Sequence, residues 1–266
     1  MFDHERQQVA AVSRARRNLD LFVIGNDSRV WTTFWGGIAF PSRLQFRLRG
    51  FAEHESTDSA LQGASDEVYL SAIGADSAAV VVGPDGMPQI ETLRAESIGD
   101  VSEDAVRGPW GGAPHVLMDF DFRRPSDWPR SFVVTLLIVE EDNERIAQTF
   151  DQLEAKVGKK VRDAAVAAAT SVVGATVGGA IGSVIPGIGT VVGAGVGALA
   201  GFAYDGIIEE VKSGLGNEVF TPRPVEIQFS DPSEARQHPD VGKPQILEVK
   251  QFGAHYAIEY DWSLVD

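Results

Sequence analysis

Alternating apolar and polar residues predict β-strands in two separate stretches of the chain. In "HYAIEYDWSLVD", residues 255–266, the apolar positions recur at every second residue: Tyr256, Ile258, Tyr260, Trp262 and Leu264. Short β-branched or alternating runs also follow one another between residues 66 and 139, separated by turn-rich segments such as "PDGMP" and "RPSDWP". A period of two is typical of a half-buried strand. We therefore expect antiparallel sheets built from both stretches.

After residue 142 the pattern changes to steps of three and four, which predict a helix. The apolar positions of residues 143–162 are Ile146, Phe150, Leu153, Val157 and Val161. This spacing places them on one face of an amphipathic helix, with Asp142 or Asn143 at its start. The helix is thus expected between the two β-rich stretches.

Beyond that helix, a run of 41 residues from Ala164 to Tyr204 contains no charged side chain. Pro186-Gly187 divides it into two parts of 22 and 17 residues, and about 20 helical residues span the core of a bilayer. Glycines recur every four residues in both halves, a spacing that lets helix backbones approach closely. They are Gly174, Gly178 and Gly182 in the first half, and Gly189, Gly193, Gly197 and Gly201 in the second.

Charges at the two ends of this run favour a helical hairpin over one long helix. Basic residues precede it and acidic residues follow it: Lys156, Lys159, Lys160 and Arg162, then Asp205, Glu209 and Glu210. A turn at Pro186 would bring these opposite charges together and leave an uncharged tip, "SVIPGIGTV", as membrane entry requires. The branched aliphatic residues of the first half favour insertion by roughly 2 to 4 kcal/mol before the glycine and hydroxyl costs are subtracted. Because the favourable and unfavourable contributions to insertion nearly cancel, the sequence predicts insertion only under some conditions.

The uncharged run resembles the hydrophobic hairpin of colicin-type pore-forming domains in its length, its uncharged tip and its richness in alanine and glycine. The resemblance implies a hairpin that is sheltered in one state and enters a membrane in another. Two other interpretations stay open. One is a hairpin permanently buried at the centre of the fold, and the other is a glycine-rich surface for self-association.

The expected fold class is α+β, mainly an antiparallel β-sandwich with an inserted glycine-zipper helical hairpin. Its parts are a basic N-terminal segment with a hairpin (1–50), the first sandwich strands (51–142), the helix and hydrophobic hairpin (143–213) and the last strands (214–266). The interrupted sandwich is similar to C2-type modules, which implies calcium binding by clustered loop carboxylates. Glu140, Glu141 and Asp142 are the candidates. They lack ligand spacing, so an acidic turn before the helix is the favoured interpretation.

In the N-terminal segment, two apolar runs surround Gly25-Asn26-Asp27 within "LDLFVIGNDSRVWTTFW", residues 19–35, and predict a β-hairpin. This stretch resembles one blade of the bacterial fucose-binding-type lectin β-propellers. Sugar in those lectins lies between neighbouring blades, so the resemblance implies a glycan site at Trp31 and Trp35. The chain has one copy of the motif, and a lone blade closes no propeller. The alternative is a hairpin with core aromatics, and we expect no fucose binding by a monomer.

Composition narrows the choice of partners. The formal net charge is −15 and the sequence pI about 4.7, so the field of the chain repels nucleic acid. Residues 1–50 differ, with eight Arg against four acids. The absence of cysteine excludes disulfides and thiolate sites. The start "MFDHERQQVAAVSRARRNLD" is charged where a signal peptide is apolar, which predicts a cytoplasmic protein or one released by a non-classical route.

Nothing in the sequence indicates an enzyme or a cofactor. The five histidines lie in different segments without metal-ligand spacing, and no nucleophile elbow, phosphate loop or dinucleotide fingerprint is present. The sequence therefore favours a non-enzymatic, membrane-active toxin or effector. Its expected partners are a lipid membrane, with a glycan, a receptor or a second copy as further candidates. The alternative is a lectin-like binding or assembly module of a larger particle, in which the hairpin is permanent core.

Overall fold

The computed structural model describes residues 9–15, 18–24, 29–36, 41–56, 67–85, 87–102, 110, 113–124, 128–141, 145–173, 204–232 and 234–266. The chain divides into two compact units. The smaller unit comprises residues 1–41 with Asp266, and the larger one comprises residues 42–265. Each unit is described by itself.

The smaller unit contains a three-stranded antiparallel sheet in the order β1-β2-β3. Its strands are β1 (Val9–Ala15), β2 (Asn18–Ile24) and β3 (Val30–Gly36). The pairing of β2 with β3, from Asn18 opposite Gly36 to Ile24 opposite Val30, confirms the two strands predicted around Gly25-Asn26-Asp27. The resemblance of this segment to a propeller blade stays a prediction.

The larger unit contains two antiparallel sheets. The four-stranded sheet has the order β11-β12-β4-β7, with β4 (Arg43–Glu55), β7 (His115–Asp121), β11 (Gln245–Gln251) and β12 (Ala254–Val265). The five-stranded sheet has the order β10-β8-β5-β6, and β9 also pairs with β8. Its strands are β5 (Val68–Val82), β6 (Pro88–Arg94), β8 (Arg130–Glu140), β9 (Glu218–Val219) and β10 (Arg223–Phe229). A short 3-10 helix, η3 (Ala235–Gln237), precedes β11.

A core rich in aromatic side chains joins the two sheets. The alternation predicted for residues 255–266 is confirmed, because Tyr256, Ile258, Tyr260 and Trp262 of β12 are all buried in it. Leu44, Phe46 and Leu48 of the neighbouring β4 are fully buried in the same core. β4 crosses the expected boundary at residue 50, so the strands of the larger unit begin earlier in the chain than predicted.

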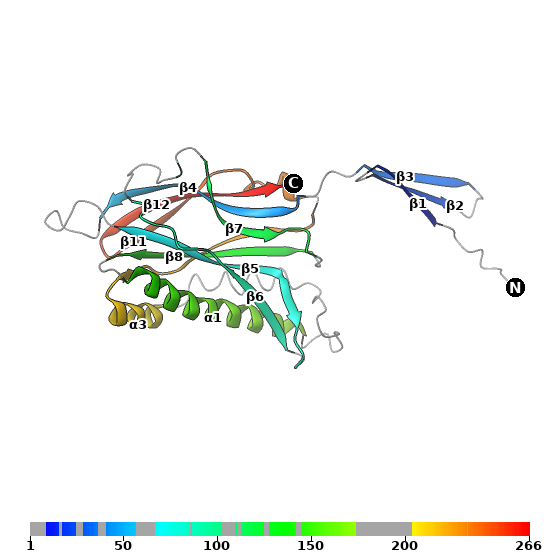
Figure 1. Cartoon of the computed structure of the whole chain (residues 1–266). Helices are drawn as coiled ribbons and strands as arrows, with labels where there is room; N and C mark the ends of the chain where they lie inside the picture. The colour runs from blue at the N-terminus through cyan, green and yellow to red at the C-terminus, as the bar shows by residue number, and fades with distance from the viewer. Residues whose placement is uncertain are drawn as a thin grey trace. The chain divides into compact units, whose positions relative to one another are not determined.

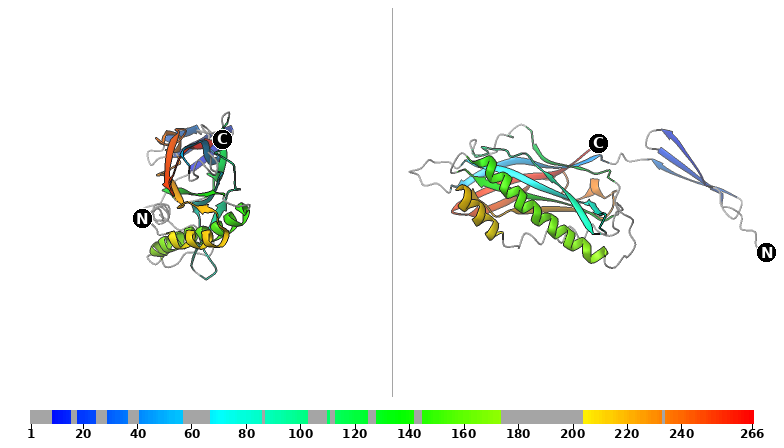
Figure 2. Two further views of the ribbon diagram at one scale, coloured as in Figure 1. Left: turned by 90° about the vertical axis from the view of Figure 1, so that its left-hand side faces the viewer. Right: turned by 60° about the horizontal axis from the view of Figure 1, so that its bottom comes forward.

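Two helices cover the other face of the five-stranded sheet, α1 (Ile146–Val173) and α3 (Asp205–Leu215) (Figure 1). Figure 2 shows both of them on this side of the unit, with the sheets beyond. The helix predicted over 143–162 is confirmed and continues to Val173. Because β8 lies between the two cores, every one of its residues is buried.

The chain is thus an α+β protein with a sandwich of antiparallel sheets and a helical layer, as the strand and helix patterns predict. Both ends of the uncharged run are described, but the glycine-zipper hairpin falls outside the described residues. Of the helices that the structure describes, none has the length and apolarity needed to cross a membrane.

Candidate functional site

The uncharged run 164–204 meets the described fold at two places. Its first ten residues, 164–173, belong to α1, and Tyr204 lies directly before α3. The predicted membrane residues between them lie outside the described residues: Gly174, Gly178, Gly182, Pro186, Gly187, Gly189, Gly193, Gly197 and Gly201. The candidate site is therefore the part of α1 and α3 that adjoins the two ends of this run.

One stripe of side chains attaches α1 to the five-stranded sheet, and its side chains become smaller along the helix. The buried residues are Phe150, Leu153, Val157, Val161, Ala165 and Ala169. Steps of three and four residues keep them on a single face. Burying a Phe or Leu side chain stabilises by about 1.5 to 3 kcal/mol, against about 0.8 kcal/mol for one methylene-sized group. Hence α1 is held least strongly where it enters the uncharged run.

The end of this stripe packs against a bent hairpin. The core that contains Ala165 and Ala169 also contains Val80 of β5 and Ile90 of β6. We call residues 80–82 and 88–90 the arm. Nearby, Arg162 Nη1 donates a hydrogen bond of 3.4 Å to Thr92 Oγ1 of β6. In Figure 1 these strands bend away from the rest of their sheet beside α1, so the arm covers the start of the uncharged run.

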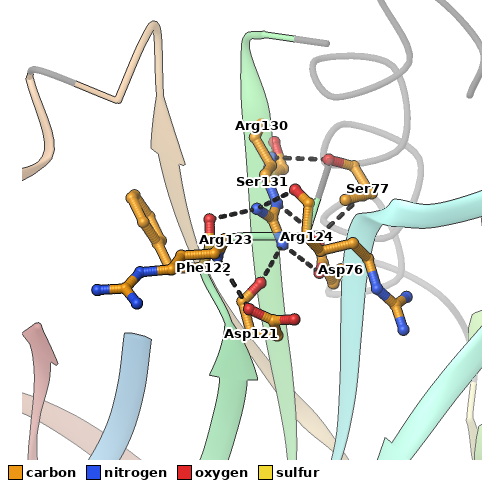
Figure 3. Close-up of polar contacts among 9 residues, drawn as sticks. Asp76, Ser77, Asp121, Phe122, Arg123, Arg124, Arg130 and Ser131 are labelled. Atoms are coloured by element: carbon orange, nitrogen blue, oxygen red, sulfur yellow. Dashed lines mark hydrogen bonds and ion pairs between the residues drawn. The ribbon is translucent and has the colours of Figure 1, made fainter. Parts of the chain in front are cut away.

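A buried ion pair fixes the bend of β5. The register of β5 against β6 shifts between Ala75 and Val80, and Asp76 lies within this shift. Arg130 is fully buried, and its Nε and Nη2 donate to the Asp76 carboxylate at 2.9 and 2.6 Å (Figure 3). Asp76 Oδ1 in turn accepts a 2.8 Å hydrogen bond from the backbone amide of Ala78. The charged pair therefore determines the local backbone from which the arm departs.

The remaining polar groups of Arg130 are also satisfied. Its guanidinium donates to the backbone carbonyl oxygens of Phe122 and Asp121 at 2.9 and 2.7 Å, and lies 4.6 Å from the ring centroid of Phe132. Ser77 Oγ accepts from the Ser131 amide at 3.1 Å. A buried charge is tolerated only when it is paired and hydrogen-bonded. The Arg130 cluster meets both conditions, so we interpret it as a structural element of the fold.

A second ionic cluster lies where the first turns of α1 meet β6. Glu154 is buried, receives a 2.6 Å hydrogen bond from Ser71 Oγ and forms an ion pair with Arg94. Arg94 Nη2 also contacts Asp151 at 2.7 Å. Arg94, Asp151 and Glu154 line an open cleft of about 510 Å³ together with Phe150. Burial raises the pKa of Glu154 above its ordinary value, against the opposing effects of Ser71 and Arg94.

The two helices run antiparallel and are joined by polar contacts. Lys156 Nζ of α1 lies 2.5 Å from a carboxylate oxygen of Glu210 in α3, so the predicted meeting of opposite charges is confirmed for this pair. A second contact lies one helical stretch away: Asn217, seven residues after Glu210, donates through Nδ2 to Oγ1 of Thr149, seven residues before Lys156, at 2.9 Å. Lys159 instead pairs with Asp163 of its own helix at 2.6 Å.

At the end of the run, Tyr204 is fully buried in the core beneath the helices. This burial raises its pKa to about 12. The tyrosine therefore stays neutral across the physiological pH range. Together with Ile208 and Val211 of α3, it fixes the point at which the uncharged run returns to the fold.

The structure places the two predicted glycan residues on one edge strand. Trp31 of β3 is 61% exposed, and its backbone lies opposite Val23 of β2. Trp35 lies opposite Leu19 in the same pairing, and its side chain is outside the described ones. A joint site of Trp31 and Trp35 stays a prediction.

The acidic trio is only partly described. Glu140 is the buried last residue of β8. The amide of Glu141 donates to the carbonyl oxygen of Glu67 at 3.0 Å, while Asp142 lies outside the described residues. Within the described part of the chain, no group of three histidine or acidic residues is arranged to hold a metal ion. Calcium binding by the trio is therefore left as a prediction without geometric support.

Two histidines that are far apart in the sequence come together at the ends of β4 and β12. The ring centroids of His54 and His255 are 4.7 Å apart, and His255 Nε2 lies 2.5 Å from Glu248 Oε2 of β11. The hydrogen bond with His255 lowers the pKa of Glu248. This cluster was not predictable from the sequence, because only the pairing of β4 with β12 brings residues 54 and 255 into contact.

Comparison with known proteins adds no relative to this picture: no family model, curated protein or solved structure matches the chain. The interpretation of the site therefore rests on its own geometry.

Proposed function

We propose that this chain is a non-enzymatic, membrane-inserting protein of the toxin or effector kind. The uncharged run 164–204 forms a glycine-zipper hairpin that enters a bilayer conditionally, and the β-sandwich shelters it or directs it to a target. One observation carries the proposal: the first ten residues of the run form the end of α1, where the buried side chains are the alanines Ala165 and Ala169.

The directions of the two helices support a hairpin. A chain that leaves on one helix and returns on its antiparallel neighbour must reverse within the intervening segment, here between Val173 and Tyr204. Pro186-Gly187 is the natural turn, and the glycine spacing on either side lets two helices pack closely. The Lys156–Glu210 pair joins the two helices that flank the run, as expected for the open end of such a hairpin.

Insertion is conditional because detaching α1 uncovers one face of the five-stranded sheet. Val133, Leu137 and Val139 of β8 are buried only because the helical layer covers them. A membrane or receptor contact must offset this exposure. We assign the targeting role to the sandwich, whose suggested similarity to C2-type modules is part of the proposal.

Acidification acts on this balance in two opposite ways. Near pH 4.5 the carboxylates begin to be protonated, with ordinary pKa values of about 3.9 for Asp and 4.3 for Glu, which reduces repulsion from anionic lipids. Glu154 works against release. Since burial raises its pKa, its protonation at low pH stabilises the attached position of α1. Acid therefore promotes approach to the membrane more than detachment of the helix.

The absence of cysteine permits a direct test, because a single introduced thiol can carry an environment-sensitive fluorophore. We expect the emission of label at Ser183→Cys, in the predicted tip, to rise and shift to the blue with anionic liposomes. Label at Ser213→Cys, an exposed position of α3, is the matched control and should change little. Encapsulated dye should leak in parallel.

Gly178→Leu with Gly193→Leu should abolish both signals, because leucine prevents close approach of the helices. Thermal melting and circular dichroism of the variant show whether the fold is retained. If the tip label and the dye release both stay unchanged at about pH 7 and about pH 4.5, the membrane-inserting function is excluded.

The second candidate function is a lectin-like binding or assembly module, in which the hairpin never leaves the fold. The exposed Trp31 favours it. A glycan array with reproducible fucoside binding by the monomer would support the lectin branch and contradict our expectation that a lone blade has no such site.

A further inference from the structure

The three-stranded sheet of the smaller unit has two apolar faces. Val9, Val23 and Trp31 lie opposite one another on three adjacent strands and therefore share one face, which we call the Trp31 face. The next residues along the strands point the other way. Of these, Phe22, Ile24 and Val30 define the Phe22 face.

Both faces expose large side chains. Val9 and Trp31 are 64% and 61% exposed on the first face, and Phe22, Ile24 and Val30 are 37%, 45% and 62% exposed on the second. A sheet with one apolar face needs one covering layer, whereas a sheet with two needs a layer on each side. Three strands alone give marginal stability unless a hydrophobic face is buried. The sheet therefore has the properties expected of a layer that is covered on both faces.

Charge indicates which partner fits. Residues 1–41 contain five Arg and four acids, which gives them a net charge of +1. Because the whole chain has a net charge of −15, residues 42–266 carry −16. The larger units of two copies repel each other, but the nearly neutral sheets do not. The six residues that define the two faces are uncharged, and the one acidic residue of β2, Asp20, lies two residues before Phe22 on the Phe22 face. An identical sheet also has the same right-handed twist, which favours aligned face-to-face packing.

We infer that the smaller units of several copies stack, with the Trp31 face of one copy on the Phe22 face of the next. Because the two faces differ, the contact is heterologous and continues from copy to copy until it closes into a ring or extends as a column. Aligned sheets pack about 10 Å apart, close enough to bury Trp31 and Phe22 together. This contact requires neither membrane insertion nor glycan binding.

The first test is the mass of the full chain by sedimentation velocity and light scattering. We expect at least twice the monomer mass of 28.6 kDa. Trp31→Lys and Phe22→Lys each block one face and should each give monomers. An equimolar mixture of the two variants should give dimers only, because one intact face of each kind remains. Ile246→Lys, at a 65% exposed position of β11 in the larger unit, should behave like the wild type.

The second test avoids bulky charges. Val23→Cys and Ile24→Cys are neighbours on the central strand but lie on opposite faces. A thiol-specific cross-linker should join a Val23→Cys copy to an Ile24→Cys copy in the mixture and should leave either variant alone unlinked. A monomeric wild type at all concentrations overturns the inference. So does cross-linking of one variant with itself, because it indicates a like-to-like contact.

Discussion

The two faces of the five-stranded sheet are covered in different ways. On the sandwich face, Phe132 packs against Phe120 at a centroid distance of 5.3 Å, and Phe120 lies 6.2 Å from Trp262. The helical face is filled mainly by aliphatic side chains, with Phe150 and Tyr204, and the α1 side chains diminish to Ala165 and Ala169. Large aromatic side chains join the two sheets on one face, whereas on the other face the contact with α1 ends at alanine methyl groups.

The polar contacts follow the same division. The sandwich end is secured by the fully buried Arg130 and its partner Asp76. The helical layer relies in part on Lys156 with Glu210 and on Arg94 with Asp151, where the Glu210, Arg94 and Asp151 side chains are more than half exposed. Its buried polar contact is Glu154, which pairs with Arg94 and accepts from Ser71. Exposed pairs contribute about 0.2 to 1 kcal/mol. This difference is consistent with our proposal that the helical layer, and not the sandwich, rearranges on insertion.

The largest effect should follow from Asp76→Ala. Removing one partner of a buried pair leaves the Arg130 charge uncompensated, so we expect a loss of about 3 to 5 kcal/mol in unfolding free energy. Urea denaturation followed by circular dichroism measures it. Asp76→Ala combined with Arg130→Met should recover much of the loss, since the unpaired charge is gone. A loss below about 1 kcal/mol in the single variant would remove the pair from our account of the bend.

Ala169→Leu should act on the helical layer alone. Overpacking at a buried position costs about 1 to 3 kcal/mol, and here it should push the end of α1 away from the arm. Amide exchange should accelerate in residues 164–173 and not in β8, and liposome leakage should increase. Ala167→Leu, on the exposed side of the same turn, is the control. Equal exchange in both variants would show that the alanine stripe does not hold the helix.

Glu154→Gln should show a pH-dependent effect of about 1 kcal/mol, the usual size for one hydrogen-bonding group. Burial raises the pKa of Glu154, so its neutral form is favoured in the fold. That contribution is fully present below the ordinary pKa and is lost as the pH rises through the folded value. The variant should therefore be more stable than the wild type near pH 8 and similar near pH 4. Melting curves across this range test the sign.

Lys156→Gln should have the smallest effect, at most about 1 kcal/mol, because Glu210 is exposed. Salt should reduce the difference from the wild type further. Melting at low and high ionic strength checks both expectations. A large loss that salt does not change would mean that Lys156 acts through packing of its aliphatic stem.

Periodic elements were predictable from the sequence. The alternation of residues 255–266 and the helical spacing from Phe150 to Val161 each repeat many times, and packing obeys the same period. β4 was not recognised, although Leu44, Phe46 and Leu48 alternate with Arg43, Gln45 and Arg47. The arginines of this strand belong to the basic N-terminal segment by composition. Their alternation with apolar residues nevertheless places them on the outer face of the sheet.

The polar clusters were not predictable, because their members are distant in the chain. Arg130 and Asp76 are 54 residues apart, and Glu154 and Ser71 are 83 apart. Each residue alone has the appearance of an ordinary surface polar or charged residue. Only the pairing of β5 with β8 and the position of α1 bring them together, and these depend on the whole hydrophobic pattern.

The pairing of β4 with β12 also orders events during synthesis. These strands are neighbours in the sheet but are separated by about 200 residues, so the four-stranded sheet lacks its β12 when the uncharged run leaves the ribosome. At about 5 to 20 residues per second, the interval between residues 204 and 254 lasts roughly 3 to 10 s. By then β5, β6, β8 and α1 have already been made. During this interval they are the surfaces available to shelter the nascent hydrophobic run.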